Sequence, residues 1–139
     1  MHRFLLFVFD LYSQERYGSL DGIKLVTLAP ELPGALSAIK ALSQKGIVVS
    51  IGHTQCSVKQ ATDAIRSGSS LVTHLFNAMR SFHHRDPGIV GLLGSDEPTY
   101  FSVIADGVHV RCLIVLCAHT LTIAAPRYSC YFCFTWLGS

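Results

Sequence analysis

One glutamate and three histidines each stand at the end of an apolar run of the sequence. They are Glu31, His53, His74 and His109, and the runs are 24–30, 47–51, 71–73 and 101–105. One carboxylate and two imidazoles are a suitable ligand set for a divalent metal and leave a coordination position open for water. Such a metal lowers the pKa of the bound water and polarises a carbonyl group, which suits the hydrolysis of an amide. The reaction also needs a general base, usually a carboxylate or a histidine, near that water.

The spacing of these residues indicates equivalent positions in a repeated unit. Glu31 and His53 are 22 positions apart, and His53 and His74 are 21 apart. A strand–helix–strand repeat of this length is typical of parallel strands joined by right-handed crossovers. The carboxyl ends of such strands share one face of a barrel, or line a crevice of an open sheet. The alternative, a chance polar residue at each strand end, is less favoured for three residues in matched phase.

Hydrophobic patterning predicts the elements that must position these residues. Strands are predicted at 24–30, 47–51, 70–75 and about 100–105, and helices at 35–45 and 58–66. Ser57 is the predicted N-cap of the second helix, and Gly46 and Gly68 are the predicted stops of the two helices. The segment 81–94 is predicted to be a loop because it is rich in glycine and contains a proline.

The composition indicates an apolar α/β domain and argues against several classes of partner. Half of the 139 residues are hydrophobic and 14% are charged, as expected where parallel strands are buried on both faces. The net charge of +2 and the lack of a lysine or arginine run argue against nucleic acid. The apolar runs 4–9 and 112–125 are too short to favour a secretory leader or a membrane span.

The cysteines and the last part of the chain carry a weaker signal. Five cysteines, an odd number, do not suggest a disulfide framework and favour a reducing, cytoplasmic setting. After position 110 the pattern changes: 111–117 is compatible with a helix or a strand, and 128–136 has no clear period. Cys130 and Cys133 form a lone C-x-x-C pair, for which apolar filler is favoured over a zinc or redox site.

A second kind of chemistry is present in the segment 83–88. Arg85 lies there among turn residues, and a guanidinium group can bind a phosphate in bidentate fashion. The alternative, that Arg85 pairs with the neighbouring Asp86 or with the surface, is equally favoured. Asn77, just past His74, can donate and accept hydrogen bonds from a turn.

Five short sequences, in this order and spacing, resemble the N-acetylglucosamine-6-phosphate deacetylases of the amidohydrolase superfamily, the animal branch above all. They are LAPE at 28–31, GHT at 52–54, THLFNAM at 73–79, HRDPG at 84–88 and IADGVH at 104–109. The resemblance implies a partial TIM-type (β/α) barrel of the metal-dependent hydrolase type, with about four βα units. It divides the chain into a divergent segment 1–16, a partial barrel domain 17–110, and a divergent cysteine-rich tail 111–139.

The resemblance also implies a role for each residue of the site. Glu31, His53 and His74 would hold a divalent metal, with zinc as the expected ion. Asn77 and the Ala78 backbone would contact the sugar phosphate. In that family the arginine at the position of Arg85 reaches the phosphate from the neighbouring subunit of a dimer. His109 would be the catalytic residue that orients the substrate and polarises the acetamide carbonyl. The reaction would release acetate and glucosamine 6-phosphate.

The sequence departs from the family at its general base. That base is an aspartate in a Thr-Asp-Ala-like segment, and no such segment follows position 110. Asp106 belongs to the IADGVH sequence and does not replace it. Activity of this chain alone is therefore expected to be impaired. Two alternatives remain open: a non-catalytic module that pairs with full-length subunits, and membrane association through the tail.

Overall fold

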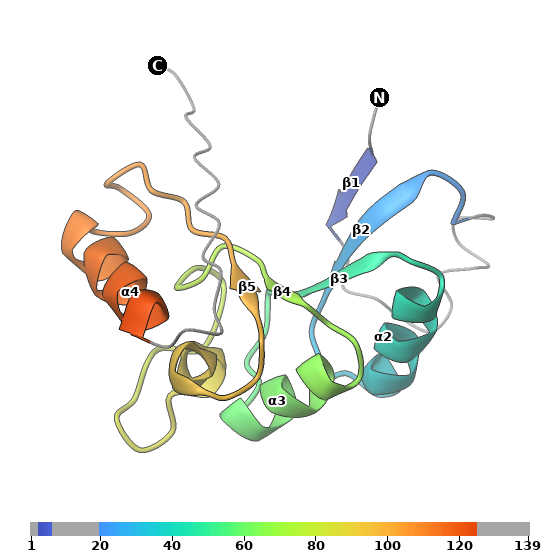
Figure 1. Cartoon of the computed structure of the whole chain (residues 1–139), viewed down its shortest axis with the longest axis horizontal. Helices are drawn as coiled ribbons and strands as arrows, with labels where there is room; N and C mark the ends of the chain where they lie inside the picture. The colour runs from blue at the N-terminus through green and yellow to red at the C-terminus, as the bar shows by residue number, and fades with distance from the viewer. Residues whose placement is uncertain (1–2, 7–19, 125–139) are drawn as a thin grey trace.

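Five parallel strands form one sheet, and they lie side by side in the order in which they occur along the chain (Figure 1). The computed structural model describes residues 3–6 and 20–124. The strands are β1 (Arg3–Leu6), β2 (Ile23–Leu28), β3 (Val48–Ile51), β4 (Leu71–Val72) and β5 (Tyr100–Phe101). A doubly wound sheet reverses its strand order at a switch point, whereas a barrel adds each strand beside the previous one. The uniform order therefore confirms an α/β fold of the partial barrel type.

Two helices follow β2 and β3 and cover the same face of the sheet (Figure 1). They are α2 (Ala35–Gln44) and α3 (Val58–Arg66), close to the predicted ranges. The Ser57 hydroxyl accepts the N–H of Gln60, and the Gln60 side chain accepts the N–H of Ser57, so the predicted N-cap is half of a capping box. Gly46 and Gly68, the predicted stops, have φ values of 74° and 119°.

Alternate residues of the strands face these helices and form the core. Val26, Leu28, Val49, Ile51, Val72 and Phe101 are at most 2% exposed. They share one hydrophobic cluster with Ile39 and Leu42 of α2 and with Ala61 and Ala64 of α3. Burial of a side chain of this size stabilises the fold by about 1.5–3 kcal/mol. This layer fixes the strand ends from which the site is built.

The opposite face of the sheet carries a row of hydroxyl groups near the carboxyl ends. The Thr27 and Thr73 hydroxyls lie 3.0 Å apart, and the Ser50 hydroxyl is hydrogen-bonded to Thr73. Gly52 lies against this row: a Cβ atom added there would be 2.8 Å from Thr73 Cβ and 3.0 Å from Thr27 Cγ2. The residue before His53 therefore has to be glycine for the hydroxyl row to pack.

The last two predicted strands are shorter than expected. The range 70–75 forms only Leu71–Val72, and the range 100–105 forms only Tyr100–Phe101. The backbone leaves the extended conformation because His74 has a positive φ of 36°. The Ser102 N–H still donates to the Val72 carbonyl at 2.9 Å, while its hydroxyl accepts the His74 N–H and its carbonyl accepts the Leu75 N–H.

The predicted loop 81–94 contains a 3-10 helix, η1 (Gly88–Gly94). Ile89 and Leu92 of η1 are buried in the core. A Cβ atom at Gly91 would be 2.9 Å from Val58 Cγ2 of α3. The glycines that predicted a loop are thus used, in part, for close packing of η1 against α3.

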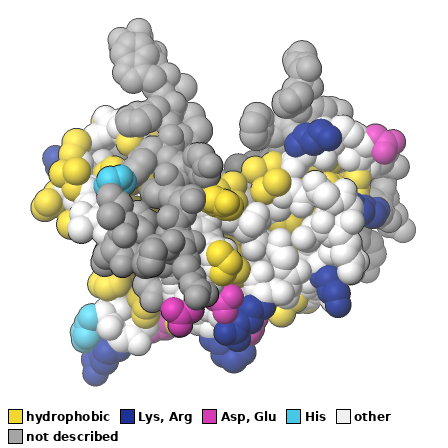
Figure 2. Space-filling model, viewed as in Figure 1, with side chains coloured by type: hydrophobic (Ala, Val, Ile, Leu, Met, Phe, Trp, Pro, Cys, Tyr) yellow, Lys and Arg dark blue, Asp and Glu magenta, His cyan; other side chains and the backbone are white. Residues whose placement is uncertain are grey.

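The chain segments outside the predicted barrel also form regular elements. Residues 3–6 form β1, which pairs with β2 and was not predicted. The open choice for 111–117 is settled as helix, because α4 (Cys112–Ala124) begins there. Ala118 of α4 is buried, but Leu113 and Leu116 are 68% and 62% exposed, and Figure 2 shows hydrophobic side chains on that part of the surface.

Among the described residues no helix is long and apolar enough to cross a membrane. The Cys130 and Cys133 pair lies outside the described residues.

Candidate functional site

His53 and His74 meet at the carboxyl ends of β3 and β4. Their Nε2 atoms lie 3.0 Å apart, and their rings are nearly perpendicular, with 4.8 Å between centroids. Two histidine ligands of one tetrahedral zinc ion, each at about 2.0–2.1 Å from it, have nitrogens about 3.3 Å apart. The chemistry and spacing of this pair thus fit two neighbouring ligands of one ion.

The turns that carry the pair have a rare backbone conformation. Among the described residues, the non-glycine residues with positive φ are His53, His74, Phe76 and Ala78, with φ between 36° and 78°. Each such residue costs on the order of 1–3 kcal/mol and persists where the surrounding structure holds it; such residues cluster at functional sites. His53 lies in the turn that follows β3, and the other three lie in the turn that follows β4.

Hydrogen bonds between neighbouring turns hold these conformations in place. The Thr54 N–H donates to the Ala78 carbonyl at 3.1 Å, and the Thr54 carbonyl accepts from the Arg80 N–H at 3.2 Å. From the next strand, the Ser102 hydroxyl accepts the His74 N–H at 2.8 Å. Neither Thr54 nor Ser102 was predicted from the sequence to have a role at the site. For Ser102 the sequence offers one signal, because it is a polar residue inside the otherwise apolar run 101–105.

Glu31 lies beside the His53 turn without joining the histidine pair. Its Oε2 accepts the Thr54 hydroxyl, and its Oε1 accepts the Gln55 N–H at 2.7 Å. No group of three His, Cys, Asp or Glu side chains in the described parts of the chain is placed to hold a metal. The structure therefore brings together two of the three predicted ligands and ties the third to the residue after His53.

Two polar atoms of the His74 turn are buried without a partner. They are His74 Nδ1 and Asn77 Nδ2, although the Asn77 N–H itself donates to the His74 carbonyl at 2.9 Å. An unsatisfied buried polar group costs about 1–3 kcal/mol. Asn77 is the residue for which the resemblance implies a substrate contact, whereas His74 Nδ1 is the ring nitrogen that does not face His53.

Cys56 is a buried cysteine bonded to the same threonine that contacts Glu31. Its side chain is buried, and its N–H donates to the Thr54 hydroxyl at 3.0 Å. Burial raises the pKa of the Cys56 thiol to about 11. The group is therefore a neutral thiol at physiological pH, and a thiol is a poor nucleophile.

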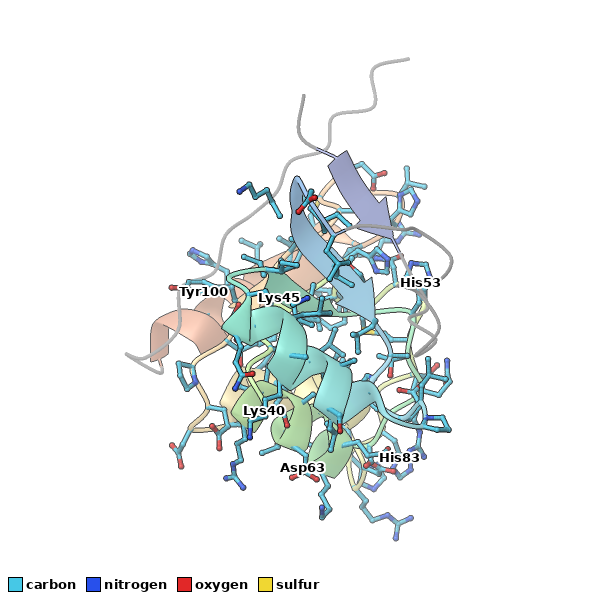
Figure 3. The ribbon with its side chains drawn as sticks, turned by 90° about the vertical axis from the view of Figure 1, so that its right-hand side faces the viewer. Lys40, Lys45, His53, Asp63, His83 and Tyr100 are labelled. Carbon is cyan, nitrogen blue, oxygen red and sulfur yellow. The ribbon has the colours of Figure 1, made fainter. Side chains whose placement is uncertain are left out.

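The segment with Arg85 lies away from the histidine pair. Figure 3 shows His83, two residues before Arg85, well separated from His53. Asp86 forms its ion pair with Arg80, at 2.6 Å, so the expected alternative of an Arg85–Asp86 pair is not observed. Arg85 is exposed, and no acidic side chain of the described residues is paired with it.

His109 is held by a turn that follows β5. Asp106 Oδ1 accepts the N–H groups of Val108 and His109 at 2.9 and 2.8 Å. Asp106 Oδ2 lies 2.6 Å from His109 Nδ1. Asp106 therefore contacts both the backbone and the ring of a predicted site residue, a relationship that was not predicted from the sequence.

Comparison with known proteins gives a consistent result. No protein-family model matches the chain. N-acetylglucosamine-6-phosphate deacetylase of Danio rerio is 49% identical over 110 residues, which are 76% of this chain and 27% of that protein. The human deacetylase is 50% identical over 108 residues, which are 74% and 26% of the two chains.

Solved structures agree with the sequence matches. The deacetylase of Mycobacterium smegmatis is 38% identical, with a TM-score of 0.70, over 79% of this chain and 31% of that one. The enzyme of Pasteurella multocida is 30% identical, with a TM-score of 0.73, over 88% and 32%. This chain spans about a quarter of the length of the curated relatives that it matches. The matched part of this chain therefore corresponds to a segment of the N-acetylglucosamine-6-phosphate deacetylases.

Proposed function

We propose that this chain carries part of an active site that hydrolyses the acetamide of N-acetylglucosamine 6-phosphate to acetate and glucosamine 6-phosphate. The observation that carries the proposal is the His53–His74 pair, with Nε2 atoms 3.0 Å apart on two turns of rare backbone conformation. These turns lie in a chain about half identical to animal deacetylases over three quarters of its length. A variant of the Mycobacterium smegmatis deacetylase has been solved in complex with N-acetyl-D-glucosamine-6-phosphate.

In this proposal His53 and His74 are two ligands of a divalent cation, with zinc as the first choice because imidazole nitrogen suits it. Glu31 is the proposed third ligand, and its nearness to the residue after His53 supports this choice. In the described conformation both its oxygens are used by Thr54 and Gln55. A bound cation of this kind lowers the pKa of water and polarises a carbonyl.

The remaining residues would bind and orient the substrate. Asn77 has an amide nitrogen that is buried without a partner, and we assign it and the Ala78 backbone to the sugar phosphate. His109 is assigned to the acetamide. Arg85 is exposed and lies on a segment remote from His53. We therefore assign it to the phosphate bound by a second copy of the chain in a homodimer.

The missing aspartate segment limits the rate that we expect. Loss of a general base lowers a hydrolytic rate by about 10²–10⁴. The alternative function, a non-catalytic module that pairs with full-length subunits, is favoured by the sheet face opposite the helices. Val48 and Tyr100 on that face are 42% and 43% exposed, a site for apolar contact with another part of a barrel.

Acetate release separates the two functions. The full chain is incubated with zinc and N-acetylglucosamine 6-phosphate, and the proposal expects slow turnover that His53→Ala and His74→Ala each abolish. His84→Ala is the matched control, since His84 lies in the exposed segment with His83. Turnover that survives both pair variants would contradict the proposal. Zinc binding without turnover, combined with co-purification with a full-length deacetylase, would favour the module.

A further inference from the structure

We infer that Asp106 is a positioning residue that keeps the His109 proton on Nδ1, so that Nε2 is the ring nitrogen left for the substrate. The inference deepens the proposed function, on which it rests, because it concerns the histidine assigned to the acetamide. Asp106 itself does not need to touch the substrate. Its role is to decide which nitrogen of the imidazole carries hydrogen.

The geometry of the turn supports this role. Asp106 Oδ1 accepts two backbone N–H groups, from Val108 and His109, and Oδ2 lies 2.6 Å from His109 Nδ1. Gly107 between them has a φ of 76°, a conformation that glycine adopts without strain. One carboxylate thus holds both the backbone and the ring of His109, and this leaves the ring little freedom to turn over.

The charge of Asp106 fixes the direction of the ring hydrogen bond. The backbone N–H of His109, its side chain and the N–H of Val108, in that order, lower the pKa of Asp106 to about 2. The carboxyl group is therefore ionised at neutral pH and can only accept hydrogen bonds. His109 Nδ1 must then donate, and in the neutral ring Nε2 carries a lone pair and no hydrogen.

This assignment has a chemical consequence for the reaction. Neutral His109 can accept a proton at Nε2 but cannot donate a hydrogen bond to the acetamide carbonyl from that atom. Only the protonated ring can polarise the carbonyl through Nε2–H, and its Nδ1–H then still donates to Asp106 Oδ2. His109 Nε2 is thus a hydrogen-bond acceptor toward the substrate when the ring is neutral, and a donor when the ring is protonated.

The substitution Asp106→Asn reverses the ring hydrogen bond with a small change in shape. The introduced amide oxygen can still accept the Val108 and His109 N–H groups. The amide nitrogen then takes the place of Oδ2 and donates to His109 Nδ1, so the ring proton moves to Nε2. In a serine protease the same change at the aspartate of the triad leaves the geometry intact and traps the histidine in the wrong tautomer.

The tautomer can be measured directly on the full chain labelled with ¹⁵N-histidine. Two-bond ¹H–¹⁵N correlation spectra are recorded through a titration to the point where the His109 ring is neutral, and His109→Gln assigns its signals. We expect the Nδ1–H form in the wild type and in the control Asp63→Asn, and a reversal of the major tautomer in Asp106→Asn. A neutral wild-type ring with hydrogen mainly on Nε2, or no change in Asp106→Asn, would overturn the inference.

The readout does not depend on turnover. If the tautomer is as expected and no acetate is released even with zinc, the proposed function fails and the positioning role stands. If acetate is released and the tautomer is the opposite one, the positioning role fails alone. Asp106→Ala, which removes all three acceptor contacts, serves as a second variant and is expected to give a mixture of both tautomers.

Discussion

Thr54 donates its hydroxyl hydrogen to Glu31 and so joins the turn after β2 to the turn after β3. The same hydroxyl oxygen accepts the N–H of Cys56 at 3.0 Å, and Thr54 is 1% exposed. One hydroxyl therefore satisfies a carboxylate and a buried backbone group at once. It also ties the proposed third metal ligand to the residue that follows His53.

Thr54→Val should destabilise the chain more than an ordinary surface change. The variant keeps the shape of the side chain but leaves the Cys56 N–H and one Glu31 oxygen without a partner, which costs about 1–3 kcal/mol. Urea unfolding followed by circular dichroism measures the loss. The control is Thr120→Val, because that hydroxyl donates to the Leu116 carbonyl on the exposed side of α4. Equal losses of unfolding free energy in the two variants would show that the Thr54 contacts stabilise the fold no more than an exposed hydroxyl does.

Zinc affinity should depend on the histidine pair. His53→Ala and His74→Ala are each expected to weaken binding by at least about 100-fold, because even outer-shell partners of a metal contribute 10–100-fold. Affinity should also fall as the pH is lowered, since imidazole binds a metal only in its neutral form. Isothermal titration calorimetry tests both statements. His84→Ala should bind as the wild type does, and wild-type affinity in both pair variants would rule out the proposed ligands.

Acid stability should contain a contribution from Asp106. Its pKa is lowered from 3.8 to about 2 in the folded chain, so the group stabilises the fold when ionised. This stabilisation is fully present above about pH 4 and is lost as the pH falls toward 2. Thermal unfolding of wild type and Asp106→Asn should therefore differ at pH 6 and converge at pH 2. A difference that grows on acidification would contradict this sign.

Arg85 should matter for ligand binding and not for folding. The side chain is exposed, so Arg85→Ala is expected to change the free energy of unfolding by less than about 0.5 kcal/mol. In a homodimer it should weaken binding of N-acetylglucosamine 6-phosphate and leave binding of N-acetylglucosamine unchanged. Calorimetry with both sugars gives the comparison, and Lys59→Ala is the control for loss of an exposed cation. Equal loss for both sugars would argue against a phosphate contact.

The sequence predicted the two helices and the strands β2 and β3 better than the ends of β4 and β5 and the details of the site. The capping residue Ser57 and the stops at Gly46 and Gly68 act locally, so their effect is visible in the order of residues. The early end of β4 was not predictable, because His74 has a positive φ that its own type does not favour. Contacts from Ser102 hold it there.

The hydrogen-bond partners of Glu31 and Asp106 also could not be predicted from the sequence. Sequence spacing placed Glu31 at the expected strand end, but only the folded chain shows that Thr54 and Gln55 use both its oxygens. Asp106 was set aside as part of a short sequence match, and its bond to His109 spans three residues in a turn that depends on Gly107. A pattern of residue types predicts which side chains lie near one another. Only the hydrogen bonds of the folded chain show which of their atoms are already used.

The strand order has a consequence for how the molecule assembles. Each strand pairs with the one before it in the chain, so Leu28 meets Ile51, Ile51 meets Val72, and Val72 meets Phe101. Each of these pairings brings together residues more than twenty positions apart, so each carries a loop-closure cost before its contacts form. The His53 turn depends on later residues, because Thr54 bonds to Ala78 and Arg80. The two histidine turns therefore become ordered together, and neither is complete without the other.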